Sequence, residues 1–343
     1  MAESAATMSA SRHSPSSPHP APADRPTFLG LPDAGERARV AVVCAPYDLT
    51  STYGKGADRG PNALIAASYA VETWDEETSR DLEPLGYTLW RPADVAAFAR
   101  QSPEAMVAEL QAVHERFLAA GQITLGLGGE HGITYGQFAA LHRRHPDLAV
   151  LQIDAHLDLR DSYEGSKHNH ACIAARFVEA GVPLVQVGMR SCSREESALV
   201  AERGLRIYWA REVAGHTAYH REVLATLVER PVFVTVDLDG FDPSIMPATG
   251  TPEPGGLSWF DVTRLLSTVG RHCTVIGADI TELAPAGGGP AGGASGAGHA
   301  FASGSAAAAA ARAESREGDR WSRPSEFLAA RLAAKMVAYF WVK

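Results

Sequence analysis

Six short apolar runs recur along the chain, and amphipathic helical patterns separate several of them. The runs cover residues 40–44, 123–127, 148–153, 184–187, 232–236 and 275–276. Continuous apolar runs of this length are typical of strands that are buried on both faces, as in a parallel sheet. Where such strands alternate with helices along a chain, the helices cover both faces of the sheet. The sequence therefore predicts an α/β fold built on a parallel sheet.

Capping signals mark where several helices begin and end. Ser102 stands before a proline and predicts a helix start, and Gly121 predicts the end of that helix. Ser258, with Asp261 three residues later, predicts a second start. Residues 325–341 carry apolar side chains on one helical face, which predicts a closing helix packed on the sheet.

Two segments have compositions that cannot support a packed core. Residues 1–26 are rich in Ser, Ala, Pro and His with few large apolar side chains, so we expect a disordered tail. Residues 286–319 are dominated by Gly and Ala, and we expect a low-complexity insertion there. The rest of residues 27–343 is predicted to form a single domain around that insertion.

Charge and cysteine usage exclude several classes of protein. The formal net charge of -9 and the lack of any dense Lys/Arg run argue against a nucleic-acid surface, which needs clustered cations. No apolar run approaches the roughly 20 residues that cross a bilayer. The four cysteines show no CxxC spacing and are expected to be reduced thiols. We therefore expect a cytoplasmic protein that binds neither nucleic acid nor membranes.

Polar residues gather after three of the predicted strands, at the edge of the sheet where α/β proteins bind ligands. They are Asp154, His156 and Asp158 after the third run, Asp237 and Asp239 after the fifth, and His131 on a glycine turn after the second. If the chain stays extended beyond residue 153, the side chains of its Asp-His-Asp set all point to one side.

These six residues together predict a site for two metal ions. A single aspartate after a strand more often caps a turn, but four buried carboxylates would cost several kcal/mol per uncompensated ion. Two divalent cations would balance the four negative charges while both histidines stay neutral. Oxygen and imidazole ligands without thiolate favour Mn²⁺, although Ni²⁺, Co²⁺ or Fe²⁺ fit similar ligands.

Several motifs together resemble those of the arginase/agmatinase (ureohydrolase) family, and in particular its agmatinase branch. They are Gly-Gly-Glu-His at 128–131, Asp-Ala-His-Leu-Asp at 154–158, Val-Asp-Leu-Asp-Gly-Phe-Asp-Pro at 236–243 and Gly-Thr-Pro-Glu-Pro-Gly-Gly at 250–256. Residues 46–61 and 279–285 extend the resemblance. It implies a three-layer αβα domain with a mainly parallel eight-stranded sheet, a pair of Mn²⁺ ions and a homo-oligomer, commonly a trimer or hexamer.

The resemblance also implies a role for each candidate residue. One metal would be held by His131, Asp154, Asp158 and Asp237, and the other by Asp154, His156, Asp237 and Asp239. Asp154 and Asp237 would bridge the pair, and the solvent between the metals would attack the guanidinium carbon. Glu282 would pair with the guanidinium, and His170 would pass a proton to the leaving amine, with His168 as its rival.

The activity implied is hydrolysis of a guanidino compound to urea and an amine. Agmatine, which gives putrescine in polyamine biosynthesis, is the leading substrate. Arg160 stands where arginases carry an asparagine that helps to bind the α-amino acid end of the substrate, so arginine is disfavoured as the substrate. Asp161 or Glu164 would attract the far amine of agmatine. Arginine, guanidinobutyrate, guanidinopropionate and free guanidine remain alternatives.

Two rival classes and two departures from the family pattern complete the expectations. A non-catalytic ureohydrolase-like binding protein would bind metal without turnover. A single-zinc amidohydrolase of the deacetylase type would need neither His131 nor Asp239 beside one Asp-His-Asp set.

Glu130 and Gly132 stand where Asp and Ser are more usual, so we expect altered contacts around His131.

Overall fold

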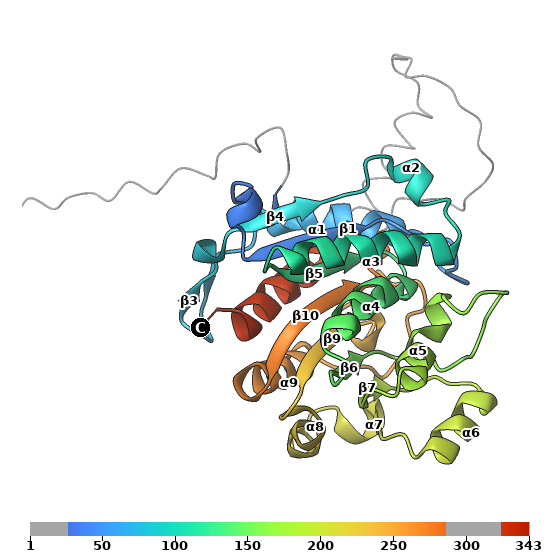
Figure 1. The fold of residues 1–343 in the computed structure, drawn as a ribbon. Coiled ribbons are helices and arrows are strands. Elements are labelled where there is room, and N and C mark those ends of the chain that lie inside the picture. The colour runs from blue at the N-terminus through green and yellow to red at the C-terminus, as the bar shows by residue number, and fades with distance from the viewer. Residues whose placement is uncertain (1–26, 286–323, 343) are drawn as a thin grey trace, which may run out of the picture.

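The computed structural model describes residues 27–285 and 324–342 (Figure 1). The predicted tail at 1–26 and the predicted insertion at 286–319 lie outside these residues. Among the helices described, none combines the length and the apolar character that crossing a bilayer requires.

The centre of the fold is an eight-stranded sheet in the order β4-β1-β5-β10-β9-β6-β7-β8. Its strands are β1 (Val40–Ala45), β4 (Tyr87–Trp90), β5 (Ile123–Gly128), β6 (Ala149–Ile153), β7 (Leu184–Met189), β8 (Ile207–Trp209), β9 (Pro231–Asp237) and β10 (Thr274–Thr281). Every pairing between neighbours is parallel. The predicted parallel sheet is thus confirmed, and no antiparallel strand joins it among the residues described.

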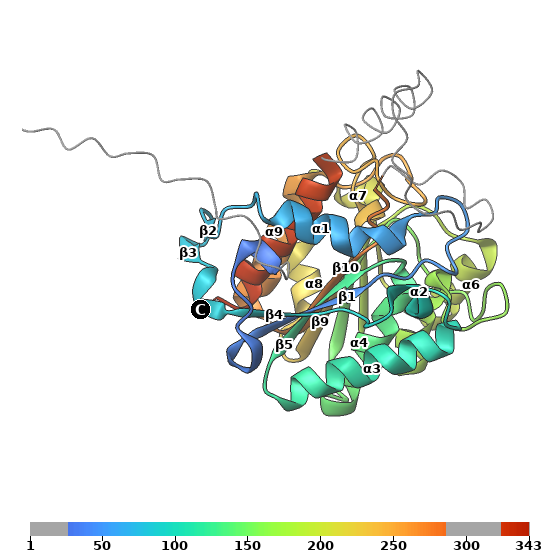
Figure 2. The same cartoon turned by 90° about the horizontal axis from the view of Figure 1, so that it is seen from above.

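Helices cover both faces of this sheet and give three layers (Figures 1 and 2). One layer holds α3 (Pro103–Ala119), α4 (Thr134–Arg144) and α5 (Ile173–Glu179). The other holds α1 (Gly60–Ser68), α8 (His220–Leu227), α9 (Trp259–His272) and the closing helix at 324–340. The other helices and the second, two-stranded sheet lie at the periphery: α2 (Val95–Phe98), α6 (Arg194–Arg203), α7 (Ala210–Val213) and the hairpin of β2 (Trp74–Asp75) and β3 (Arg80–Asp81).

The capping signals behave as predicted. The Ser102 side chain accepts a hydrogen bond from the main-chain N–H of Ala105 and starts α3. Ser258 and Asp261 form a reciprocal capping box at the start of α9. The closing helix buries Leu332 and Met336 in the main core, as its apolar face predicted.

Two strands of the eight-stranded sheet were not predicted, and they are its two edges, β4 and β8. Both are short and contain aromatic residues rather than a continuous aliphatic run. β10 is also longer than the predicted run at residues 275–276. The prediction stopped early because Gly277, Asp279 and Thr281 interrupt the apolar run, although all three are buried.

The topology brings the carboxyl ends of β5, β10, β9 and β6 side by side. Ile280 of β10 pairs with Leu127 on one side, and Thr281 pairs with Asp237 on the other. Residues that follow these strands therefore meet at one edge of the sheet.

Candidate metal centre

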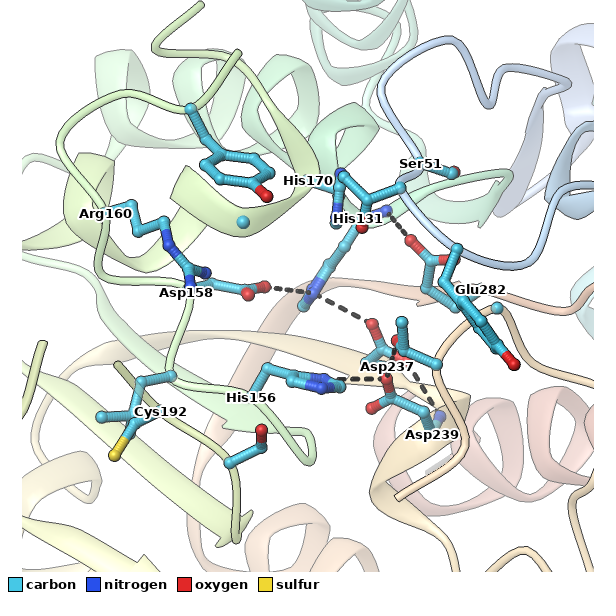
Figure 3. A pocket seen from close by; sticks show the side chains of 18 of the residues that line it. Ser51, His131, His156, Asp158, Arg160, His170, Cys192, Asp237, Asp239 and Glu282 are labelled. Carbon is cyan, nitrogen blue, oxygen red and sulfur yellow. Dashed lines mark hydrogen bonds and ion pairs between the residues drawn. The ribbon is translucent and has the colours of Figure 1, made fainter. Parts of the chain in front are cut away.

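The residues predicted to bind metal do meet at this edge, in and beneath a cavity of about 240 Å³ (Figure 3). His131, His156, Asp158, Asp237 and Asp239 line the cavity, and Asp154 lies buried beneath them. His131 lies three residues after the end of β5, Asp154 directly follows β6, and Asp237 is the last residue of β9. Glycine permits the approach of β5 to its neighbour, because a Cβ at Gly129 would collide with the main chain of Tyr47.

Three carboxylates converge on a single nitrogen of His131. Its Nδ1 lies 3.0 Å from Asp154 Oδ2, 3.2 Å from Asp158 Oδ2 and 3.3 Å from Asp237 Oδ2. Despite these distances, this buried nitrogen makes no hydrogen bond of acceptable geometry to any residue described. A cation bound between this nitrogen and the three carboxylate oxygens would use the lone pairs of all four atoms.

A second group forms on the other side of Asp154. His156 Nδ1 lies 3.0 Å from Asp239 Oδ2 and 3.8 Å from Asp154 Oδ1. The ligand atoms of His131, Asp154 and Asp158, and separately those of Asp154, His156 and Asp239, all lie within 4.8 Å of one another. Asp154 belongs to both groups, so the donor set fits two cations that share a carboxylate.

Burial and mutual repulsion disturb the protonation of these groups. Burial and the charge of Asp154 raise the pKa of Asp158 to about 7. Burial and the charge of Asp239 likewise raise the pKa of Asp237 well above its usual value. Although burial opposes it, the charge of Asp239 raises the pKa of His156 to about 11. Ligands that retain protons in this way would release them to solvent when a metal ion takes their place, so the residues present fit the metal pair.

The chain does not stay extended through the Asp-His-Asp set, which differs from the expectation. β6 ends at Ile153, and Asp158 adopts a positive φ of 51°, which is uncommon for a residue other than glycine. Because of this turn, Asp158 faces His131 while His156 faces Asp239. Asp239 likewise lies in a short 3₁₀ turn, Leu238–Gly240, and not on the strand.

Hydrogen bonds from neighbouring polar side chains orient several of these residues. His131 Nε2 lies 2.8 Å from Thr235 Oγ1, which fixes the ring with Nδ1 toward the carboxylates. The Gln152 amide donates to Asp154 Oδ2 at 2.8 Å, and the Thr251 hydroxyl contacts Asp239 Oδ2 at 3.2 Å. Such partners reduce the freedom of the ligands before a metal binds.

Arg190 supports the second group, and the sequence analysis did not identify it. Its guanidinium donates to the carbonyl oxygens of Asp239 at 2.6 Å and Glu253 at 2.7 Å. It also donates to the carbonyls of Gly240 and Phe241. Arg190 therefore ties the end of β7 to the turn that carries Asp239. No spacing in the sequence marks this role, because the contacts are to the main chain.

Glu282 reaches the cavity from the end of β10, as predicted (Figure 3). Its Oε1 accepts the main-chain N–H of His131 at 2.7 Å, and its own N–H donates to Gly129. Burial and the nearby charge of Glu130 raise the pKa of Glu282 to about 8. A buried carboxylate with this raised pKa favours a cationic partner.

Of the two histidines considered for proton transfer, only His170 lines the cavity. His168 instead packs its ring against Tyr135, with ring centroids 4.9 Å apart. Glu130 does not contact the His131 side chain; its carboxylate accepts hydrogen bonds from Thr50 and Ser51. The altered contact expected at this position is therefore to a loop.

The acids expected to attract a far amine do not face the cavity. Asp161 pairs with Lys167 and Arg176 on the outer surface. Glu164 is exposed and is absent from the cavity lining. Apart from the metal candidates and Glu282, the acid that lines it among the residues described is Glu196, whose buried carboxylate accepts the N–H groups of Leu159 and Ser193. The spacing Ser193-x-x-Glu196 predicts a helix start, but it gives no sign that the glutamate faces a cavity.

Comparison with known proteins gives one consistent result. Residues 38–303 match the model of the arginase family. The chain is 40% identical over 254 residues to N(1)-aminopropylagmatine ureohydrolase of Synechocystis sp., covering 73% of this chain and 83% of that protein. It is 32% identical to the agmatinase of Halalkalibacterium halodurans over 73% of this chain and 86% of that one.

Solved structures show the same architecture. Agmatine ureohydrolase of Thermoplasma volcanium superposes with a TM-score of 0.70 at 28% identity, covering 89% of this chain and 90% of that one. Arginase from Medicago truncatula, at 22% identity, shares the fold with a TM-score of 0.69 over 88% of this chain and 87% of its own.

Proposed function

The chain belongs to the arginase family and hydrolyses guanidino compounds, and from that premise we propose that its substrate is a guanidinoalkylamine. Agmatine, cleaved to putrescine and urea, is the first candidate, and N(1)-aminopropylagmatine is the second. The names of relatives support both. The observation that carries the proposal is the convergence of two candidate metal groups and Glu282 on one cavity.

We propose that two divalent cations bind at these groups, with Mn²⁺ first and Ni²⁺ or Co²⁺ as alternatives. One would be held by His131, Asp154, Asp158 and Asp237, and the other by Asp154, His156, Asp237 and Asp239. The chemistry that such a pair supplies when bound is the activation of water at neutral pH. The short contact between His131 Nδ1 and Asp237 supports the place of Asp237 beside the first group.

The reaction also needs the guanidinium held in place and a proton delivered to the leaving amine. Because the His131 N–H already occupies Oε1 of Glu282, Oε2 is the oxygen available to the guanidinium. Charge-assisted hydrogen bonds there would orient the planar group toward the metal groups. His170, on the cavity wall, is the proposed donor to the leaving amine.

Glu196 is the proposed partner of the far amine. Its side chain is 3% exposed, and Arg160 Nη1 lies 4.0 Å from its Oε2. Arg160 also lines the cavity and lies over the ring of Tyr163. This arginine favours a different candidate function, because a guanidinium would suit the carboxylate of guanidinobutyrate or guanidinopropionate.

A substrate panel tests the proposal. Urea release by Mn²⁺-loaded protein would be measured on agmatine, N(1)-aminopropylagmatine, arginine, guanidinobutyrate, guanidinopropionate and guanidine, with metal counted on the same sample. We expect one of the two amines to have the highest kcat/KM, and Glu196→Gln to raise its KM. The Asp154→Ala protein, purified identically, controls for contaminating activity. Preference for a guanidino acid, lost in Arg160→Met, would replace the proposed substrate class.

Two metals with no urea from any compound, also after Ni²⁺ and Co²⁺ loading, would favour a binding protein. One metal per chain with amide hydrolysis would favour the deacetylase type.

We further propose a cytoplasmic homo-oligomer, a trimer or hexamer, with residues 27–343 as one domain. Sedimentation equilibrium measures its mass, and a monomer at micromolar concentration would contradict this proposal.

A further inference from the structure

Glu130, one residue before His131, is fully buried, and its side-chain oxygens are the acceptors in each hydrogen bond they make among the residues described. Its Oε2 accepts the main-chain N–H of Thr50 at 2.6 Å and that of Ser51 at 3.0 Å. Its Oε1 lies 2.5 Å from the hydroxyl oxygen of Thr50. An ionised carboxylate only accepts hydrogen bonds, so in that state the Thr50 hydroxyl donates its proton to Glu130.

The same hydroxyl oxygen touches His170 twice. The main-chain N–H of His170 donates to Thr50 Oγ1 at 3.1 Å, and the ring Nδ1 lies 3.3 Å from that oxygen. A hydroxyl group offers one proton and two lone pairs. When the Glu130 carboxylate is ionised, it takes the hydroxyl proton, so both contacts from His170 are donors and Nδ1 carries a hydrogen.

We propose that Thr50 is a positioning residue that holds His170 in its Nδ1–H tautomer, so that Nε2 is the nitrogen that exchanges a proton with the substrate. The inference rests on the proposed role of His170 in the reaction. Nε2 would take a proton released by the attacking water and give the same proton to the leaving amine. Nδ1 keeps its own proton throughout, and Thr50 and Glu130 end the cycle unchanged. The chain from Glu130 through Thr50 to His170 resembles, in its logic, the orienting group of a hydrolase triad.

Anchoring of the loop and orientation of His170 can be separated. Loop residues Ser51, Thr52, Tyr53 and Gly54 line the cavity (Figure 3 labels Ser51). The two main-chain N–H groups that bind Glu130 belong to this loop and do not depend on the Thr50 side chain. A valine at position 50 retains these bonds and the shape of the side chain, and deletes only the hydroxyl.

The test compares Thr50→Val with Thr50→Ser, which restores the hydroxyl. We expect Thr50→Val to lower kcat roughly 10- to 100-fold, which is less than the roughly 100- to 10,000-fold that a positioned acid or base contributes, because His170 itself stays in place. Its KM and metal content should match the unmodified protein, and Thr50→Ser should recover kcat to within about threefold. Thr263→Val, which deletes a hydroxyl bonded to Trp259 in α9, should leave kcat unchanged. If Thr50→Val does not fold, Thr50→Ala deletes the same hydroxyl and carries the same expectation.

A double mutant shows whether Thr50 acts through His170. In the His170→Ala background, Thr50→Val should lower kcat by less than about twofold, since the group it positions is gone. A full further loss, or a rise in KM with kcat unchanged, would overturn the inference. If His170→Ala alone keeps normal kcat, the proposed role of His170 fails. If His170→Ala is impaired while Thr50→Val is not, that role stands and only the part assigned to Thr50 fails.

Discussion

Glu282, which directly follows β10, contacts His131 in the segment after β5. The main-chain N–H of His131 donates to Glu282 Oε1 at 2.7 Å. This bond joins the residue proposed to bind the guanidinium to a residue proposed to bind metal. The backbone of Glu282 has a positive φ of 65°, which residues other than glycine rarely adopt without tertiary support such as this bond. The position of the carboxylate is therefore set before substrate arrives.

Glu282→Gln separates charge from position. The amide oxygen can still accept the His131 N–H, so metal content and thermal stability should stay close to those of the unmodified protein. The ion pair with the guanidinium is lost, and kcat/KM should fall at least about 100-fold, as expected when a buried charged partner is removed. Steady-state urea release and metal counting check this. Activity within tenfold of normal would contradict the role of Glu282.

Substitution of Asp154 and substitution of His156 should remove different numbers of metal ions from the protein. Asp154 belongs to both candidate groups, while His156 belongs only to the second. Asp154→Ala should therefore lose both metals, and so should Asp237→Ala if that carboxylate bridges, whereas His156→Ala should keep about one metal per chain. Mass-spectrometric metal counting after dialysis measures this. An Asp154→Ala protein with one full metal would show that the groups are independent.

Arg190→Met should weaken the second group without touching it directly. The substitution removes the bonds to the carbonyls of Asp239 and Glu253, so the turn carrying Asp239 gains freedom. Loss of such an orienting contact typically lowers metal affinity about 10- to 100-fold. Metal titration by calorimetry should show one weakened site. Arg203→Met, which removes an exposed arginine paired with Glu202, is the matched control and should leave both sites unchanged.

The sequence predicted the central strands and the metal candidates for the same reason. A strand buried on both faces is a continuous apolar run, and polar residues directly after it stand out. The edge strands β4 and β8 escaped prediction because half-buried, aromatic segments such as Tyr87–Trp90 lack that run. His170 and Glu282, by contrast, were identified as candidates only because their local motifs resemble a known family.

Thr50, Arg190 and Glu196 were missed because their contacts lie far apart in the sequence. Thr50 meets His170 across 120 positions, and Arg190 meets Asp239 across 49. Neither relation leaves a local pattern. The expectation that Asp161 would face the substrate failed for a related reason, since Asp161 is 72% exposed and pairs with Lys167 and Arg176 instead. Only the tertiary structure decides which acid faces the cavity.

Lys335, in the closing helix, joins that helix to the β2–β3 hairpin through a buried cluster of charges. Its Nζ lies 2.8 Å from Asp75 Oδ2, 2.9 Å from Glu76 Oε1 and 3.1 Å from Glu77 Oε1. The side chains of Lys335 and Asp75 are 2% and 1% exposed, while Glu76 is 61% exposed. Removing one partner of a buried pair costs roughly 3–5 kcal/mol, because the other charge stays buried.

We therefore expect Lys335→Met to lower the free energy of unfolding at pH 7 by about 3–5 kcal/mol, and Glu76→Gln by about 1 kcal/mol or less. Although burial opposes it, the bond from Lys335 lowers the pKa of Asp75. The stabilisation from Asp75 is thus present above its unfolded pKa of about 3.9 and is lost as pH falls through its lower folded pKa. Without Lys335, burial raises that pKa, so protonation relieves the variant.

The pH dependence separates this cluster from other causes of instability. Although burial opposes it, the pKa of Lys335 is raised by Asp75, so its stabilisation persists up to about pH 10.4 and is lost only as pH rises through the folded pKa. The difference between Lys335→Met and the unmodified protein should be largest near neutral pH and shrink as pH falls toward 4. Urea unfolding at a series of pH values measures that difference, in which shared carboxylates cancel. A difference that is constant with pH would show that Lys335 stabilises the fold by packing alone.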